Sequence, residues 1–159
     1  MGESAGGGLA AALALLARDR GEYPIAFQLL DAPMIDDRTC VRPPHPVAGE
    51  FVFTPASNRF GWRCLLGEEP GGDGVSPYAA AARAEDLSGL PPAFIATGAL
   101  DLFLDENLDY AARLARAGVP IELHVYPGAP HGYALAGSAQ VTRTATRDKL
   151  DALRRAFAR

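Results

Sequence analysis

The chain has 159 residues, a length that suits one domain and gives no reason to expect a second. Apolar residues make up 48% and charged residues 21%, which is ordinary globular usage and excludes a wholly disordered chain. The formal net charge of -4 offers no electrostatic attraction for nucleic acid or for an anionic membrane, so we expect neither as a partner.

Two features of the sequence bear on the cellular compartment. Residues 9–17 form an apolar run, but the run is too short to span a bilayer, and acidic Glu3 precedes it instead of a basic residue. Cys40 and Cys64 are too few for a disulfide scaffold, and neither belongs to a CxxC pair. We therefore expect a cytoplasmic protein with neither a signal peptide nor a membrane anchor, whose two thiols are reduced and partly buried; one disulfide between them is the alternative.

The first half of the chain predicts two helices and one strand separated by loops. Residues 5–18 are rich in Ala and Leu, and a glycine shortly afterwards ends the predicted helix. Residues 25–30 form a short apolar run that is typical of a buried strand. The Pro-rich residues 31–55 predict a loop, residues 58–66 a short helix, and the Gly-rich residues 67–77 another loop.

The second half of the chain predicts strands and helices in alternation. Residues 93–97 are apolar on both faces, as in a strand covered by helices, and residues 121–126 form another strand. Helices are predicted over residues 104–117 and 139–158. This alternation favours an α/β fold with a parallel sheet and right-handed crossovers. The side chains of the last helix that are expected to face inward are Leu150, Leu153 and Phe157.

The first residues of the chain contain a nucleophile motif. Gly2 to Gly6 read G-x-S-x-G, with Ser4 in the middle and an Ala-rich helix behind. A serine on a sharp strand-to-helix turn needs small neighbours, and the N-terminus of the helix favours negative charge developing on a substrate oxygen. Chance produces this pattern in about one such chain in twenty, and the ordinary alternative makes Ser4 a helix N-cap.

A serine hydroxyl needs a base to remove its proton, and histidine has the most suitable pKa. His131 comes shortly after the strand predicted at residues 121–126, at the carboxyl end where sites gather in parallel sheets. His45 lies in a Pro-rich loop and is expected to be exposed, and His124 lies inside a strand. We therefore expect His131 to be the base.

A carboxylate is needed to orient the imidazole and to stabilise its charged form. Asp101 follows the apolar strand of the second half after a short turn, and its ordinary alternative is a helix N-cap. Asp105 and Glu106 are expected in the first turn of the following helix, where they favour its dipole. The order Ser4, Asp101, His131 is the Ser…Asp…His order of α/β-hydrolases.

Several stretches spread over nearly the whole chain match the pattern of one family. In this combination the chain resembles the second half of a bacterial hormone-sensitive-lipase-like carboxylesterase, within the α/β-hydrolase superfamily. The matching stretches are Gly2-Glu3-Ser4-Ala5-Gly6-Gly7, residues 33–38, Ser76-Pro77-Tyr78, residues 86–92, Thr97-Gly98 with Asp101, Leu104-Asp105-Glu106, and residues 126–128 leading to His131-Gly132.

The resemblance implies a three-layer α/β-hydrolase fold, in which helices flank a parallel sheet. Residues 1–159 would be the C-terminal part of a single α/β-hydrolase catalytic domain. By resemblance, Ser4 is the nucleophile, His131 the general base and later the acid, and Asp101 the orienting carboxylate. The Ala5 N–H would be one donor of the oxyanion hole, and neither a metal nor a cofactor is implied.

The sequence also departs from the family pattern, because it lacks the His-Gly-Gly-Gly segment that precedes the nucleophile. The strand that leads into the nucleophile turn is expected to be absent as well, which leaves one edge of strand 25–30 without a partner. We therefore expect a chain whose N-terminal half is missing, as a fragment, through a wrongly assigned start codon, or as one piece of a larger assembly, and we expect it to be poorly soluble and almost inactive alone. The expected partners are a small-molecule acyl ester and either a second copy or the missing N-terminal half.

An apolar cluster in the predicted helix at residues 58–66 is the candidate acyl pocket. The cluster lies in the segment that resembles the acyl-pocket region of the family, although ordinary core packing explains it equally well; its residues are Phe60, Trp62, Leu65 and Leu66, and the first three are the candidate substrate-binding residues. The resemblance implies hydrolysis of short- to medium-chain acyl esters through an acyl-enzyme. The alternatives are an amidase, a deacetylase or a lactonase on the same fold, and a non-catalytic fragment without a complete oxyanion hole.

Overall fold

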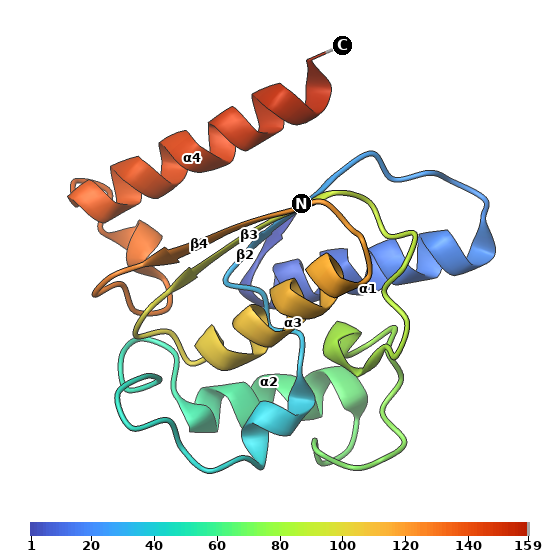
Figure 1. The fold of residues 1–159 in the computed structure, drawn as a ribbon. Coiled ribbons are helices and arrows are strands. Elements are labelled where there is room, and N and C mark those ends of the chain that lie inside the picture. The colour runs from blue at the N-terminus through green and yellow to red at the C-terminus, as the bar shows by residue number, and fades with distance from the viewer. Residues whose placement is uncertain (159) are drawn as a thin grey trace.

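The structure is a computed structural model that describes residues 1–158 (Figure 1). The strands within these residues are all parallel and lie in one sheet in the order β1-β2-β3-β4, which is also their order along the chain. The strands are β1 (Gly2–Glu3), β2 (Gln28–Asp31), β3 (Ala93–Gly98) and β4 (Ile121–Tyr126). The helices are α1 (Ser4–Arg20), α2 (Pro55–Leu66), α3 (Leu104–Arg116) and α4 (Gln140–Phe157), with short 3₁₀ helices at Asp37–Cys40, Ala81–Arg83 and Tyr133–Leu135.

The predicted fold class is confirmed, because helices cover both faces of a parallel sheet. Leu30 of β2 and Ile95 of β3 pack with α1 and α3, whereas Leu29 and Phe94, one residue earlier, pack with α4. Figure 1 shows the same layers, with α4 on one face of the sheet and α1 and α3 on the other. Because successive side chains of a strand alternate between faces, β3 is buried along its whole length.

The strand β1 corrects one expectation. Gly2–Glu3 pairs in parallel with Leu30 and Asp31 at the end of β2, so the strand leading into the nucleophile turn is present in these two residues. Parallel pairing requires only backbone N–H and C=O groups in register, and two residues are enough to start it. The strand β2 begins at Gln28, later than predicted, where its ladder with Ala93 of β3 starts.

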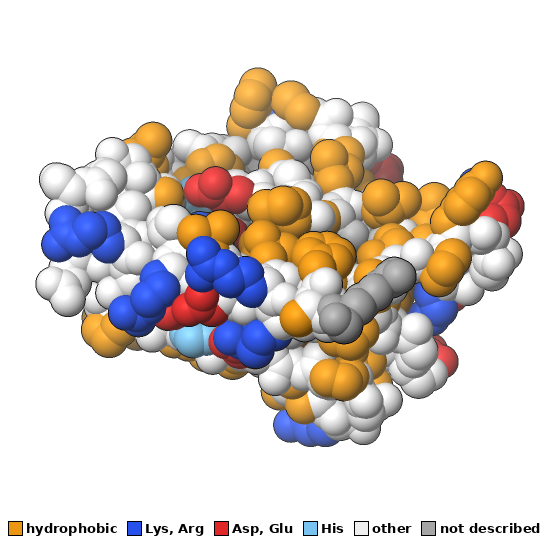
Figure 2. Space-filling model, turned by 90° about the horizontal axis from the view of Figure 1, so that it is seen from above, with side chains coloured by type: hydrophobic (Ala, Val, Ile, Leu, Met, Phe, Trp, Pro, Cys, Tyr) orange, Lys and Arg blue, Asp and Glu red, His pale blue; other side chains and the backbone are white. Residues whose placement is uncertain are grey.

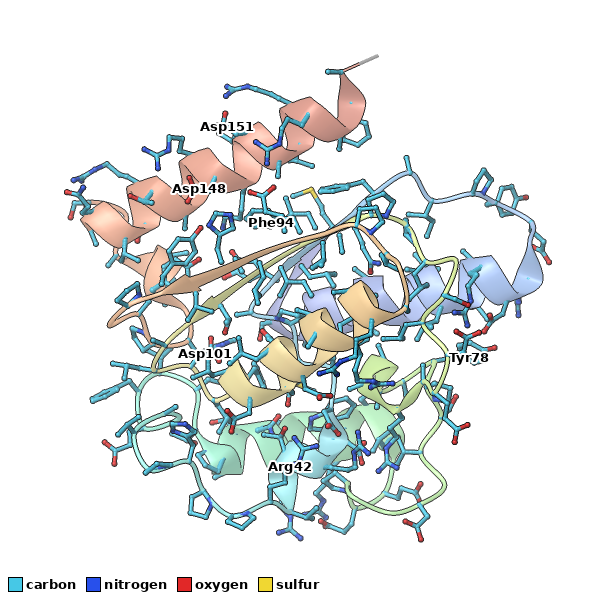
Figure 3. All side chains as sticks on the ribbon, in the orientation of Figure 1. Arg42, Tyr78, Phe94, Asp101, Asp148 and Asp151 are labelled. Atoms are coloured by element: carbon cyan, nitrogen blue, oxygen red, sulfur yellow. The ribbon has the colours of Figure 1, made fainter. Side chains whose placement is uncertain are left out.

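The inward face of α4 also differs from the prediction. Leu150 is 47% exposed and Phe157 is 64% exposed, and of the three predicted residues only Leu153 packs against the core. The helix instead places small side chains against aromatic residues of the sheet, such as Phe94 (Figure 3). Because those aromatic rings fill much of the space between the layers, the fully buried positions of the helix carry small side chains. The buried residues of α4 are Thr142, Ala145 and Ala152.

The outer surface on the α4 side is divided between charged and hydrophobic side chains. Figure 2 shows Lys and Arg side chains gathered at one side of this face and hydrophobic side chains across its middle. Lys149 of α4 forms an ion pair with Asp31, a buried carboxylate at the end of β2. A charge pair therefore holds α4 to the sheet in addition to packing, and removal of one partner would leave a buried charge without compensation.

The helix α2 packs near the carboxyl ends of the strands. It begins after Thr54, whose hydroxyl caps the first turn, and it ends at a glycine in the left-handed conformation. Its Trp62 is fully buried in a cluster with Met34, which follows β2, and Phe103, which follows β3. This cluster fixes α2 beside the edge of the sheet where the candidate site residues lie.

Both cysteines are free thiols, as the sequence indicated. Cys40 is half-buried, and burial raises the pKa of its thiol to about 12. Cys64 is exposed rather than partly buried. Within residues 1–158, none of the helices combines the length and the apolar character that crossing a membrane requires.

Gly98→Ala is expected to destabilise the fold. The added methyl group would lie 2.1 Å from the carbonyl oxygen of Ala129, so β3 or the loop that follows β4 must move. Overpacking of this kind lowers the free energy of unfolding by about 1–3 kcal/mol, which chemical denaturation measures. The control is Gly137→Ala, because a methyl group there meets no atom within 4 Å. Equal stability of the two variants would contradict this packing.

Candidate active site

The candidate nucleophile Ser4 lies on a sharp turn between β1 and α1. Its backbone φ is +53°, a left-handed conformation that residues with a side chain rarely adopt. A methyl group on Gly2 would lie 2.1 Å from the carbonyl oxygen of Gly6, whereas one on Gly6 would meet no atom within 4 Å. The first glycine of the motif is therefore required by the close approach of two backbone segments, and the strained turn presents the Ser4 hydroxyl at the start of the helix.

His131 lies beside Ser4 at the carboxyl edge of the sheet. Its Nε2 is 2.9 Å from the Ser4 Oγ, and its Nδ1 is 2.8 Å from the Asp101 Oδ2. Asp101 is fully buried and His131 is only 7% exposed, so water competes little for these hydrogen bonds. When Nδ1–H donates to the carboxylate, Nε2 is available to accept the serine proton. The structure thus brings together the three side chains named from the sequence.

The turn after β3 holds Asp101 in place. The Asp101 Oδ1 accepts the backbone N–H of Phe103 at 2.8 Å, while Oδ2 faces His131. The same turn contacts the loop of His131, because the Leu100 N–H donates to the Ala129 carbonyl at 2.9 Å. Figure 3 shows Asp101 at this end of the sheet, near the start of α3. The N-cap of α3 is Phe103, so Asp101 does not have the capping position that was its alternative.

An apolar cavity of about 580 Å³ opens next to Ser4. Its walls come from α1, from the segment after β2 and from α2. Phe60 and Leu65 line it as predicted, and so does Ala5, the residue after the candidate nucleophile. A cavity with so little polar surface suits a hydrocarbon group. The lining residues are Ser4, Ala5, Gly8, Leu9, Met34, Phe53, Ala56, Ser57, Phe60, Gly61, Leu65 and Ala79.

The structure does not place Trp62 in this cavity, unlike the expectation for a substrate-binding residue. An α-helix turns about 100° per residue. Ser57, Gly61 and Leu65 therefore share the face of α2 that lines the cavity. Asn58 and Trp62 share a different face, which is fully buried. Trp62 is thus a core residue, in line with the alternative explanation of core packing.

The other two histidines have partners elsewhere. His45 accepts two backbone N–H groups of its own loop through Nδ1. His124 stacks on Phe94 with 5.1 Å between ring centroids and pairs with Glu122 on the α4 side of the sheet. All three histidines lie within the described residues, and His131 is the one that is hydrogen-bonded to Ser4. Within residues 1–158, no group of three or more His, Cys, Asp or Glu side chains could hold a metal ion.

Glu106 is a buried carboxyl group whose role the sequence did not reveal. It occupies the first turn of α3 as predicted, but it is almost completely buried. Its Oε1 accepts the Ile35 N–H at 2.8 Å, and its Oε2 accepts the Thr39 hydroxyl. Its spacing in the sequence could have indicated this burial. Glu106 stands four and eight residues before the buried Tyr110 and Leu114 and therefore shares their face of the helix.

Residues 33–35, whose backbone bonds to side chains of α3, also contact the nucleophile turn. Asn107, next to Glu106, donates from its side-chain amide to the Pro33 carbonyl at 2.8 Å. The following residue, Met34, donates its backbone N–H to the Ser4 carbonyl at 3.0 Å. The first turn of α3 is therefore connected to Ser4 through one short backbone segment, and we regard it as a support of the site.

Comparison with known proteins identifies similar chains. A family model described as alpha/beta hydrolase fold matches residues 1–135. The chain is 38% identical to Esterase LipI of Mycobacterium tuberculosis (strain ATCC 25618 / H37Rv) over 155 residues, or 96% of this chain. It is 41% identical to hormone-sensitive lipase of Mus musculus over 61 residues, which are 38% of this chain and 8% of that protein. The solved structure of Bacterial Heroin Esterase matches with a TM-score of 0.87 and 41% identity over 98% of this chain.

The chain spans about half the length of these esterases. The match covers 48% of LipI and 50% of the Bacterial Heroin Esterase chain. The matched part includes Ser4, Asp101 and His131, which all lie within residues 1–135 of the family match.

Glu106→Gln is expected to make the stability of the fold less dependent on pH. Burial raises the pKa of Glu106 from an ordinary 4.5 to about 8, so between these values the folded state binds a proton that the unfolded state releases. The stability contributed by this residue is therefore fully present below pH 4.5 and is lost as the pH rises through about 8. Glutamine keeps the shape of the protonated side chain and does not titrate.

Denaturation at about pH 5 and about pH 8.5 measures this effect. The wild type should lose more stability between the two conditions than Glu106→Gln. Glu85→Gln, at an exposed position, is the matched control and should follow the wild type. If Glu106→Gln follows the wild type as closely as the control does, Glu106 titrates at an ordinary pKa and the prediction fails.

Proposed function

Because this chain belongs to the alpha/beta hydrolase fold family, as its resemblance to hormone-sensitive-lipase-like esterases predicted, we propose that it carries the reacting side chains of a serine carboxylesterase. The observation that supports this most is the chain of two hydrogen bonds from Ser4 through His131 to Asp101, at 2.9 Å and 2.8 Å. The proposed substrates are carboxylic esters with short to medium acyl chains.

In the proposed reaction, the Ser4 Oγ attacks the ester carbonyl carbon while the His131 Nε2 takes its proton. Asp101 keeps the imidazole in the tautomer that can accept this proton and stabilises the imidazolium that forms. His131 then returns the proton to the leaving alcohol, which leaves an acyl group on Ser4. A water molecule, deprotonated by His131, attacks this acyl-enzyme; the bond between the acyl carbon and the Ser4 Oγ breaks, His131 returns the proton to the Oγ, and the acid is released.

The oxyanion of the tetrahedral intermediate needs hydrogen-bond donors. We propose the Ala5 N–H as one donor, because Ala5 follows Ser4 at the N-terminus of α1 and lines the same cavity. The backbone N–H groups in the first turn of a helix have no partner within the helix, and the helix dipole favours negative charge there. This donor acts in the transition state, where such a bond contributes most to rate.

The acyl chain of the ester is proposed to occupy the apolar cavity beside Ser4. The cavity begins at the nucleophile and is lined by Phe60 and Leu65 on α2 and by Leu9 on α1. Transfer of each methylene from water to such a surface contributes about 0.8 kcal/mol. Acyl chain length should therefore affect KM more strongly than the nature of the alcohol.

Ser4→Ala is expected to abolish labelling by a fluorophosphonate probe and to lower ester hydrolysis by about 1,000-fold or more, because the attacking oxygen is removed. Asp101→Asn should lower kcat by about 10,000-fold, because the amide favours the wrong imidazole tautomer. Ser76→Ala is the control, because Ser76 is exposed and its hydroxyl accepts the N–H of Tyr78, which Figure 3 shows far from Asp101.

The outcomes of this experiment separate the candidate functions. A wild-type chain that is not labelled would contradict the proposed function and favour the non-catalytic fragment without a complete oxyanion hole. Labelling that survives in Ser4→Ala would place the nucleophile elsewhere. Parallel assays with p-nitrophenyl butyrate and the matching anilide distinguish an esterase from an amidase. The proposal requires the ester to be the better substrate.

Gly61→Leu is expected to shorten the acyl chains that are accepted. A methyl group on Gly61 would meet only the Met34 Cε and Sδ, at 3.8 and 3.9 Å, so a larger side chain enters the cavity without striking the backbone. Loss of space for two methylenes should raise KM for p-nitrophenyl octanoate about tenfold or more and change KM for the acetate little. Gly137→Leu is the control and should keep the chain-length preference of the wild type. If Gly61→Leu keeps that preference as well, the acyl chain binds elsewhere.

A further inference from the structure

The His131 ring contacts two phenylalanine rings, Phe53 and Phe103, in addition to making its two hydrogen bonds. Phe53 lies against it with 5.1 Å between ring centroids and an angle of 45° between the ring planes. Phe103 meets it edge-on, at 5.1 Å and 88°. The two phenylalanines also contact each other, with centroids 5.6 Å apart. Phe103 comes two residues after Asp101 in the chain, but Phe53 comes from a distant loop.

The loop that carries Phe53 connects the turn of Asp101 with the turn of His131. At one end, the Gly49 N–H donates to the Leu100 carbonyl at 3.1 Å, in the turn that precedes Asp101. At the other end, the Val52 side chain packs over Gly132, where an added methyl group would lie 3.3 Å from the Val52 Cγ1. The segment from Gly49 to Phe53 is therefore anchored beside both of these site residues.

The backbone of this loop is strained at the residue before Phe53. Val52 has φ +63°, which is a rare conformation for a β-branched residue. The Phe53 N–H donates to the Phe51 carbonyl at 2.7 Å, so the three residues form a γ-turn. Phe51 is 54% exposed and Val52 is 64% exposed, whereas Phe53 is half-buried and lines the cavity beside Ser4. The turn thus directs one ring inward, and such strain persists where neighbouring contacts hold it.

Hydrogen bonds alone leave the imidazole free to tilt. The two bonds of His131 act at opposite ring nitrogens, toward Asp101 and toward Ser4, and so resist movement along the line that joins them. Rotation about that line changes both bond lengths little and is resisted mainly by atoms packed against the ring. Proton transfer depends on the direction of the Nε2 lone pair, so a tilt lowers the rate without removing either bond.

We propose that Phe53 is a positioning residue, which prevents the His131 ring from tilting and at the same time forms a wall of the acyl cavity. This inference rests on the proposed function of Ser4 and His131, because Phe53 acts on the reaction only through the imidazole. The strained turn at Val52 holds the ring in this place.

Three Phe→Leu variants separate the two roles of Phe53. Phe53→Leu removes the contact with His131 and should lower kcat for p-nitrophenyl acetate about 10- to 100-fold, with KM changed much less. Phe60→Leu alters the cavity wall and should change KM for longer acyl chains. Phe51→Leu makes the same change on the exposed side of the same turn and should leave both constants unchanged. Phe53→Tyr keeps the ring and should restore kcat.

The ring resonances of His131 in NMR spectra give a readout that does not depend on activity. Loss of the Phe53 ring should move these resonances in Phe53→Leu, and they should stay in place in Phe51→Leu and Phe60→Leu. If fluorophosphonate does not label the wild type, the proposed function fails, while the resonances still show whether the Phe53 ring contacts the imidazole. Unmoved resonances or unchanged kcat in Phe53→Leu would overturn the inference, and so would a Phe53→Tyr variant as slow as Phe53→Leu.

Discussion

The hydrogen bond between the His131 imidazole and the Ser4 hydroxyl joins residues 127 positions apart, and it depends on the parallel register of the sheet. Because all the strands within residues 1–158 run in the same direction, their carboxyl ends meet at one edge. The turns after β1, β3 and β4 place Ser4, Asp101 and His131 at that edge. A slip of one residue between β3 and β4 would move His131 by about 3.3 Å, more than a hydrogen bond tolerates.

The surroundings of these residues are stiffened by close backbone contacts and by buried polar groups. Gly2 and Gly98 allow carbonyl groups of neighbouring segments to approach closer than any side chain would permit. Glu106 and Asn107 on α3 satisfy backbone groups of the segment that bonds to Ser4. Each of these polar groups is buried, so displacing it would leave a donor or acceptor without a partner, and this penalty keeps the segment in one position.

Different faces of the same element have different roles at the site, and apolar residues form each of these faces. On α2, one face carries Trp62 into the core and fixes the helix, while the face with Gly61 and Leu65 remains open to the cavity. In the loop before α2, Phe53 contacts both the cavity and the His131 ring. The proposed acyl pocket and the proposed base therefore share a wall, which connects substrate binding to the placement of the imidazole.

The sequence by itself determined the alternation of helices and strands and pointed to Ser4, Asp101 and His131. These follow from local properties, namely glycine spacing, apolar periodicity and position just after a strand. Only the tertiary structure decided that two residues before Ser4 pair as β1, that Glu106 is buried, that Trp62 belongs to the core and that Ala145 rather than Leu150 faces the sheet. The physical reason is that periodicity shows which residues share a face, but the partner's shape determines which face is buried and how large its side chains can be.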